Sequence, residues 1–60
     1  MTIQEAILIL DPETTIEALA EIEYYAGFSG KKAKIHAVDE ACEIAVETMR
    51  RYLELEKKKP

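Results

Sequence analysis

The sequence has few of the residues that cross-link or brace small proteins. Cys42 is the only cysteine among 60 residues, so an intrachain disulfide is excluded. Cys42 and His36 are the only soft metal ligands, and their spacing does not resemble a zinc site. We therefore expect no metal and no cofactor. A domain of this length buries only about 60% of its unfolded surface, so partner subunits are the remaining source of stability.

Long hydrophobic runs and a signal peptide are also missing. No stretch approaches the roughly 20 apolar residues of a membrane span, and the N-terminus lacks the basic start and apolar core of an export signal. Together with the single thiol, this predicts a cytoplasmic protein without a membrane partner.

Positive charge is absent from the first half of the chain. Residues 1–30 hold six acidic and no basic side chains, whereas residues 31–60 hold eight basic and six acidic ones. The net charge of −4 argues against sequence-specific nucleic-acid binding. The two halves can attract one another, either within a chain or between chains.

With only two glycines and two prolines, most of the chain is expected to be helical. Thr2 and Glu5 have capping-box spacing and predict a short helix over 3–10. Asp11-Pro12 ends it and starts a second helix over 12–26, with Asp11 as N-cap. Thr14 and Glu17 offer an alternative capping box for that start.

The third helix is the longest. Gly27 ends the second helix as a C′ glycine, and Ser29 can cap a third helix over 30–57, which contains no further glycine or proline before Pro60. A basic tail over 57–60 complements the helix dipole. The fold class predicted is therefore all-α: residues 1–60 form one domain, a short N-terminal helix plus a helical hairpin with a long C-terminal helix.

The third helix has more apolar surface than a surface helix needs. Two neighbouring stripes cover well over half of its circumference, against the roughly 100° of a half-buried helix, and two short helices cannot cover both. An alanine stripe, Ala33, Ala37, Ala41 and Ala45, would let another helix approach closely. We therefore expect a homo-oligomeric helical bundle, with the chain itself as partner. The main stripe holds Ile35, Val38, Ala41, Cys42, Ala45, Met49, Tyr52 and Leu53, and the second holds Ala33, Ala37, Ile44 and Leu55.

One segment combines aromatic rings, glycines and cations. Unpaired N–H groups at a helix start favour an anion such as phosphate, and an exposed ring can stack on a base. These features predict a nucleotide-like ligand, with Arg50 or Arg51 of a neighbouring chain completing the site. The candidate ligand-binding residues are Tyr24, Tyr25, Phe28, Ser29, Gly30, Lys31, Lys32, Arg50 and Arg51.

Structural roles could explain the same residues. Gly27 and Ser29 could only end and start helices, Tyr25 and Phe28 could belong to the core, and the lysines could pair with glutamates of the second helix. The remaining residues of interest also have plain explanations: His36 as a solvated side chain, Cys42 as a small buried hydrophobe, and Arg50 and Arg51 as helix-surface partners of Glu47 and Glu54. No nucleophile, base and orienting group come together, so no catalytic residues and no enzyme activity are expected.

Two stretches, EAILILDPETTIEALAEIEYYAGF (5–28) and VDEACEIAVETMR (38–50), resemble small helical proteins encoded by phages and prophages of Gram-positive bacteria. The resemblance implies a setting in the host cytoplasm, where small phage accessory proteins counter host defence. It carries no functional residues.

In that setting, the first hypothesis is an oligomeric sponge that sequesters a nucleotide-derived immune signal, of the cyclic-oligonucleotide or ADP-ribose type. The second is an acidic inhibitor that blocks the basic groove of a host defence nuclease. The third is a purely structural helical adaptor. The acidic face of the second hypothesis comprises Glu13, Glu17, Glu21, Asp39, Glu43 and Glu47.

Overall fold

The computed structural model describes residues 1–58. It consists of α1 (Ile3–Leu10), α2 (Thr15–Ala26), a 3-10 turn η1 (Gly27–Ser29) and α3 (Gly30–Lys57). Residues 1–58 contain no strand, so the predicted all-α class, with its short N-terminal helix and one long helix, is confirmed. Of the predicted basic tail over 57–60, Lys59 and Pro60 lie outside the described residues.

Helix α1 starts at the predicted capping box. The Glu5 backbone N–H donates to the Thr2 hydroxyl oxygen at 3.1 Å, and the Thr2 N–H donates to Glu5 Oε1 at 3.2 Å. This pair of bonds satisfies N–H groups that the first helical turn leaves unpaired.

The start of the second helix differs from the prediction. Helix α2 begins at Thr15 rather than at Pro12, because Asp11 forms a turn instead of an N-cap. Its carboxylate accepts the Glu13 N–H at 2.9 Å, and its carbonyl accepts the Thr15 N–H at 2.8 Å. Thr14 occupies the N-cap position, but its hydroxyl donates to the Leu8 carbonyl at 2.7 Å, so the second capping box does not form.

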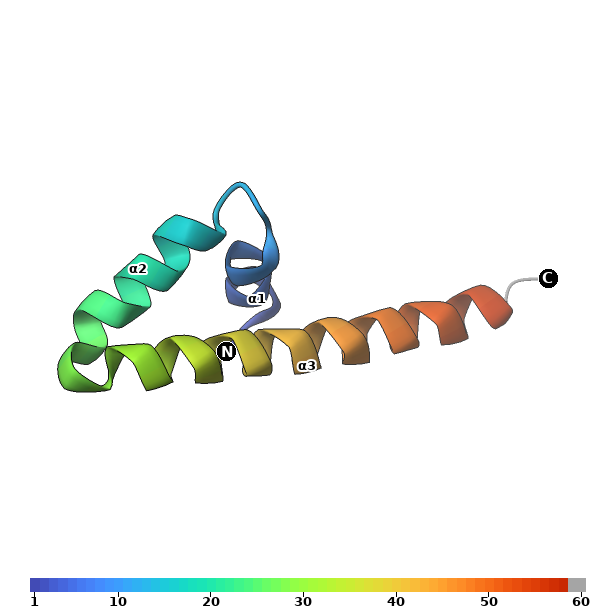
Figure 1. Ribbon diagram of the computed structural model, residues 1–60. Coiled ribbons are helices and arrows are strands. Elements are labelled where there is room, and N and C mark those ends of the chain that lie inside the picture. The colour runs from blue at the N-terminus through green and yellow to red at the C-terminus, as the bar shows by residue number, and fades with distance from the viewer. Residues whose placement is uncertain (59–60) are drawn as a thin grey trace.

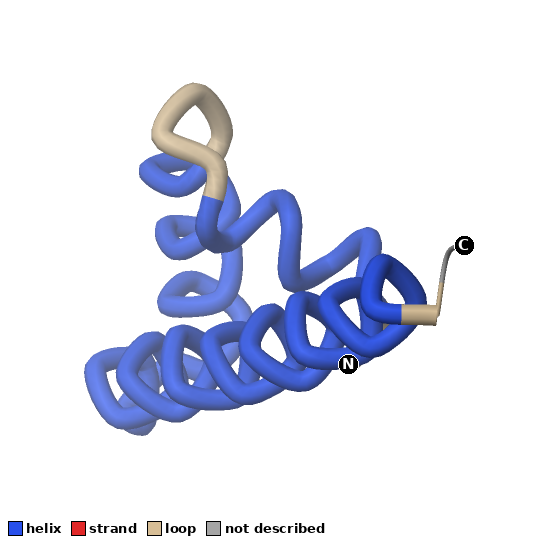
Figure 2. Tube along the Cα trace, turned by 90° about the vertical axis from the view of Figure 1, so that its right-hand side faces the viewer, coloured by secondary structure: helices blue, strands red, loops and turns tan. Residues whose placement is uncertain are grey.

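Helices α1 and α2 lie on the same side of α3 and cover only its first half (Figures 1 and 2). The core is small: Ala6, Ile9 and Ala41 are the buried hydrophobic residues of the described chain. The alanine stripe of α3 does allow a close approach, and the approaching helices belong to the same chain. Partly buried side chains around this core are Ala18, Leu19, Ile22, Ala37, Val38 and Ile44.

The N-terminus is held against α3. The Met1 amino group lies 3.1 Å from Glu40 Oε2. Its hydrogen bond to Glu40, and the negative charge of that carboxylate, raise the pKa of the amino group above 8.0. This contact helps to hold α1 against the middle of α3.

The molecule is elongated, with extents of 52 × 20 × 14 Å. Its radius of gyration is 14.1 Å, against about 10 Å for a compact domain of 60 residues. The second half of α3 extends alone beyond α1 and α2 (Figure 1). All residues from 46 to 58, which we call the free end of α3, are exposed.

Candidate functional site

The three aromatic residues before α3 point into solvent. Phe28 is fully exposed, and Tyr24 and Tyr25 are 80% and 78% exposed. The rings of Tyr24 and Tyr25 meet edge to face, with centroids 5.2 Å apart. The alternative that placed Tyr25 and Phe28 in the core is therefore wrong. Residues 24–32, which we call the aromatic turn, present three accessible rings.

Gly27 takes the predicted role at the end of α2, because its φ of +59° lies in a region that L side chains rarely adopt. Ser29 does not take its predicted role. It precedes α3, but its side chain makes no capping hydrogen bond. The physical reason is that η1 leads directly into the helix, with Ser29 at φ −93° and ψ 9° rather than in the extended conformation of a typical N-cap.

Gly30 is buried where α2 and α3 come closest. A Cβ atom at this position would lie 2.8 Å from the Glu23 carbonyl oxygen and 3.2 Å from the Glu23 Cα. The contact with the carbonyl oxygen is shorter than real Cβ atoms show and the contact with the Cα is tight, so the position strongly favours glycine. Gly30 was expected only as a ligand-binding residue, and the one signal of this packing role in the sequence is a glycine at the joint between two helices.

The three lysines that follow Gly30 are not equivalent. Lys34 forms an ion pair with Glu23, Nζ to Oε2 at 2.9 Å, as the structural alternative predicted. Lys31 and Lys32 are exposed. Two cations thus lie within one helical turn of the exposed Phe28 ring.

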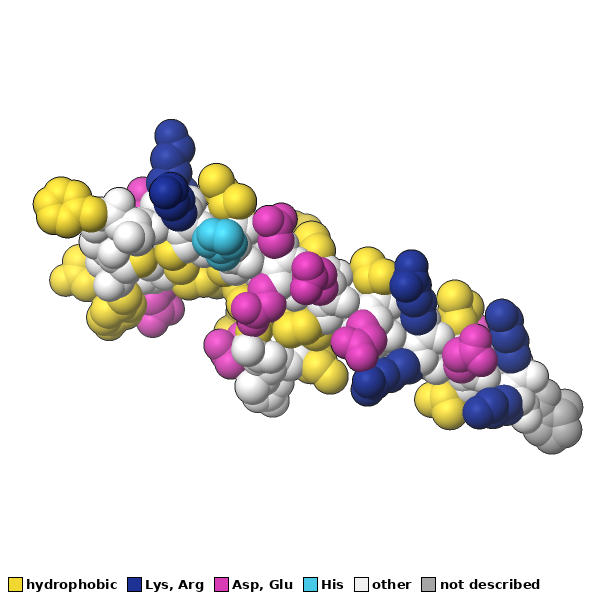
Figure 3. All heavy atoms as spheres, turned by 90° about the horizontal axis from the view of Figure 1, so that it is seen from below, with side chains coloured by type: hydrophobic (Ala, Val, Ile, Leu, Met, Phe, Trp, Pro, Cys, Tyr) yellow, Lys and Arg dark blue, Asp and Glu magenta, His cyan; other side chains and the backbone are white. Residues whose placement is uncertain are grey.

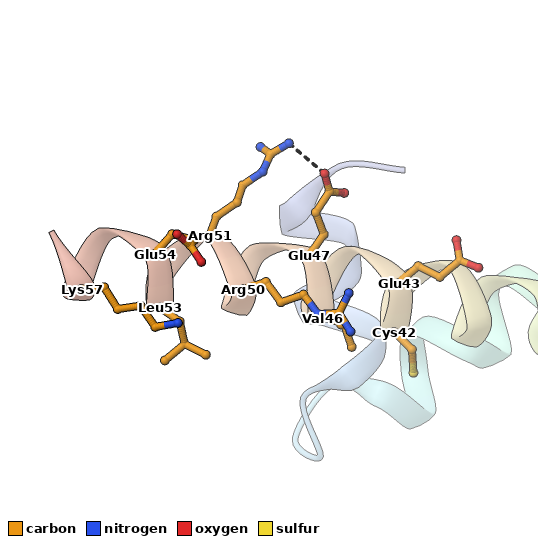
Figure 4. Close-up of a pocket in the computed structure, with 9 residues that line it drawn as sticks. All are labelled: Cys42, Glu43, Val46, Glu47, Arg50, Arg51, Leu53, Glu54 and Lys57. Carbon is orange, nitrogen blue, oxygen red and sulfur yellow. Dashed lines mark hydrogen bonds and ion pairs between the residues drawn. The ribbon is translucent and has the colours of Figure 1, made fainter.

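Arg50 and Arg51 lie at the other end of α3. Eighteen residues separate Lys32 from Arg50, which is roughly 27 Å along a helix, so one chain cannot bring these cations together. Arg51 forms an ion pair with Glu47 at 2.8 Å, as predicted (Figure 4). Arg50 and Arg51 line an open groove along the free end, together with Cys42, Glu43, Val46, Glu47, Leu53, Glu54 and Lys57.

Two further predictions about burial are wrong. Cys42 is exposed rather than buried, because α1 and α2 pack on a different side of α3. Ile16, whose helical spacing from Leu19 and Ala20 predicts an apolar stripe with them, is 79% exposed, since it precedes the residues of α2 that pack on the core. His36 is exposed, as expected.

Apolar surface dominates what the chain offers to a partner. Figure 3 shows the side of α3 that faces away from α1 and α2, where charged side chains run along the middle and hydrophobic ones emerge at both margins. The exposed large hydrophobic residues of α3 are Ile35, Val46, Met49, Tyr52, Leu53 and Leu55. The main stripe predicted for α3 is therefore largely uncovered in a single chain.

The groove between α1 and α2 is a second open apolar feature. Tyr25 lines it with Leu8, Ile9, Ala18, Ile22 and Ala26. Tyr25 therefore faces a different surface from the rest of the aromatic turn.

Among residues 1–58, no group of three or more His, Cys, Asp or Glu side chains is placed to hold a metal ion. No helix within the same range is long and apolar enough to cross a bilayer. What the geometry offers is an extended apolar face on α3 and a cationic, aromatic turn at its start. Comparison with known protein families, with curated proteins and with solved structures finds no match to this chain.

Proposed function

We propose that this chain is a homo-oligomeric binding protein whose subunits associate through the exposed apolar face of α3. One observation carries the proposal: the chain exposes 5278 Å², whereas a compact monomer of this mass exposes about 4,000 Å². The excess, about 1,300 Å², is larger than the roughly 800 Å² that each partner buries in a standard protein interface.

The composition of this surface supports association. The free end of α3 has four hydrophobic side chains that are more than half exposed: Met49, Tyr52, Leu53 and Leu55. Each Å² of apolar surface removed from water is favourable by about 25 cal/mol. Exposed apolar surface of this extent is typical of an interface rather than of a solvated surface.

The test is the solution mass of the wild type and of two variants, measured by sedimentation from about 1 to 200 µM. Met49→Glu places a charge on the apolar face and should shift the protein to monomer. His36→Glu is the matched control, because it adds the same side chain to an exposed polar position of the same helix, and it should leave the mass unchanged. A wild-type protein that is monomeric at 200 µM would overturn the proposal.

A second candidate function, which requires the first, concerns the aromatic turn. The exposed Phe28 and Tyr24 rings, and the exposed Lys31 and Lys32 that follow them in the sequence, suit a ligand with a planar base and phosphate groups. Stacking of a base on an aromatic ring contributes about 1–3 kcal/mol. We propose a nucleotide-derived ligand of the cyclic-oligonucleotide or ADP-ribose type, which the protein would sequester without catalysis.

Calorimetry with cyclic dinucleotides, cyclic trinucleotides and ADP-ribose tests this second function. Alanine at both Lys31 and Lys32 should weaken binding at least tenfold. Arginine at both Lys31 and Lys32 keeps the positive charge at the same positions and is the matched control, which should retain binding. Absence of heat and of any thermal shift with every compound would exclude the ligand while leaving the oligomer proposal intact.

A further inference from the structure

Six apolar residues of α3, four of them exposed and Val38 and Ala45 half-buried, follow a coiled-coil repeat. Ile35, Cys42 and Met49 are seven residues apart, and Val38, Ala45 and Tyr52 are placed three residues after each of them. This alternation of three and four residues is the seam of a left-handed helix pair. We call these six residues the seam. Met49 and Tyr52 are more than half exposed, and Cys42 is exposed.

We propose that two copies of the chain pair antiparallel through this seam, with the two-fold axis beside Glu43 and Ile44. The inference rests on the proposed association and specifies its geometry. In this register Ile35 packs against Tyr52 of the partner subunit. Val38 packs against the partner's Met49, and Cys42 lies against the partner's Ala45.

An open apolar surface lies near each end of the seam. An apolar groove of about 230 Å³ lies between α2 and α3, lined by Leu19, Lys34, Ile35, Val38 and Asp39. Thr48, Met49, Tyr52 and Leu53 form a second apolar surface at the free end. The proposed two-fold axis places this second surface of each subunit on the groove of the other. Both open apolar surfaces are then covered by one symmetric contact.

Charge favours the antiparallel orientation over the parallel one. Antiparallel pairing puts Lys31 opposite the partner's Glu56, and each helix start lies next to a helix end of opposite dipole. Parallel pairing in register would set Lys31 against the partner's Lys31, and Glu56 against the partner's Glu56. It would also leave the free ends of both subunits beyond α1 and α2 of either chain, so that each free end would be covered only by the other.

The arrangement changes the expectation for the aromatic turn. The proposed register brings Glu56 of the partner subunit next to Lys31. The partner's Arg51 then lies roughly 8 Å farther along the helix axis. The same register puts the partner's Lys57 opposite Gly30 and the partner's Lys58 opposite Ser29, so an anion at the turn would meet cations of both chains, but not Arg51.

Cross-linking of mixed single-cysteine variants tests the register in the full chain. In a Cys42→Ala background, the Val38→Cys variant carries an affinity tag and the Met49→Cys variant does not. After mixing and subunit exchange, a short bismaleimide should join the tagged to the untagged chain. Each variant alone should cross-link at least fivefold less, because like positions lie roughly 16 Å apart along an antiparallel pair.

The Ile35→Cys and Tyr52→Cys pair repeats the test at sites that are more than half exposed in one chain, so a failure of Val38→Cys to fold does not obscure the result. Efficient cross-linking of each variant with itself would indicate a parallel pair and overturn the inference. An oligomer without mixed cross-links at either pair would also overturn it, while the proposed function survives. A monomeric wild-type protein would overturn both the antiparallel pair and the proposed function.

Discussion

The two glycines of the chain are required for different reasons at the joint between α2 and α3. Gly27 holds a positive φ, whereas Gly30 leaves room for the backbone of Glu23. Ser29 lies between them and makes no capping bond. The joint therefore depends on backbone geometry at two positions and not on the side chain between them.

Alanine substitutions separate these contributions. Gly27→Ala should lower the free energy of unfolding by about 1–3 kcal/mol through backbone strain, and Gly30→Ala by about 1–3 kcal/mol through overpacking. Ser29→Ala should change it by less than about 0.5 kcal/mol. Urea denaturation at one fixed protein concentration measures all three. A Ser29→Ala effect as large as that of Gly30→Ala would show that the joint has been wrongly described.

The capping box makes one carboxylate sensitive to acid. The hydrogen bond from the Thr2 backbone N–H, followed by that of the Thr2 side chain, holds the pKa of Glu5 below 4.5. A depressed carboxyl pKa stabilises the folded state above the unfolded-state pKa of about 4.5. That stability is lost as the pH falls through the lower folded-state pKa.

Glu5→Gln should therefore flatten the fall in melting temperature between pH 5.5 and pH 3, because glutamine can occupy the same position without titrating. Glu13→Gln is the matched control, since its carboxylate has no ion pair or hydrogen bond with residues 1–58. Thermal scans at four pH values are sufficient. Equal slopes for the two variants would show that the capping box does not contribute to acid sensitivity.

At the scale of elements, local signals predicted the helices well. The capping box of α1, the glycine that ends α2 and the long run of helix-forming residues in α3 all act within a few residues of one another. Burial depended on tertiary contacts that no local pattern contains. Cys42 and Ile16 look like core residues by spacing. Helices α1 and α2, however, pack on another side of α3 than Cys42, and Ile16 precedes the residues of α2 that pack on the core. The close approach at Gly30 could not be predicted for the same reason.

The free end of α3 should be helical only where something covers it. Isolated helices shorter than about 12–15 residues are marginal in water, and no residue from 46 to 58 is buried. Hydrogen exchange should therefore show low protection for amides 49–57 at 1 µM and at least tenfold higher protection at 200 µM. Amides 37–44 in the covered half should change less. Equal protection of the free end at both concentrations would indicate that it takes no part in assembly.

At the scale of the whole molecule, the core is too small to explain a stable monomer. Only Ala6, Ile9 and Ala41 are buried hydrophobic residues in the described chain, and two of the three are alanines that bury little area. Stability of a small domain is a narrow difference between large terms, so we expect the proposed association to contribute a sizeable share of it.

Melting temperature should consequently depend on protein concentration. For a dimer that unfolds to separated chains, each tenfold increase adds about 1.4 kcal/mol, which corresponds to roughly 5 °C for 120 residues. Circular dichroism melts from 5 to 500 µM measure this, and the Met49→Glu variant should show no such dependence. A wild-type melting temperature that is constant over this range would contradict coupled folding and assembly.

The exposure of the free end of α3 also affects which substitutions this sequence can accept during evolution. The residues of the free end add no buried side chain to their own chain, so the fold of a single chain does not constrain what occupies the positions of Met49 and Tyr52. Selection for folding alone would let these positions drift toward polar residues. Retention of apolar residues there at coiled-coil spacing, in any set of relatives, would be the evolutionary signature of the surface that covers them.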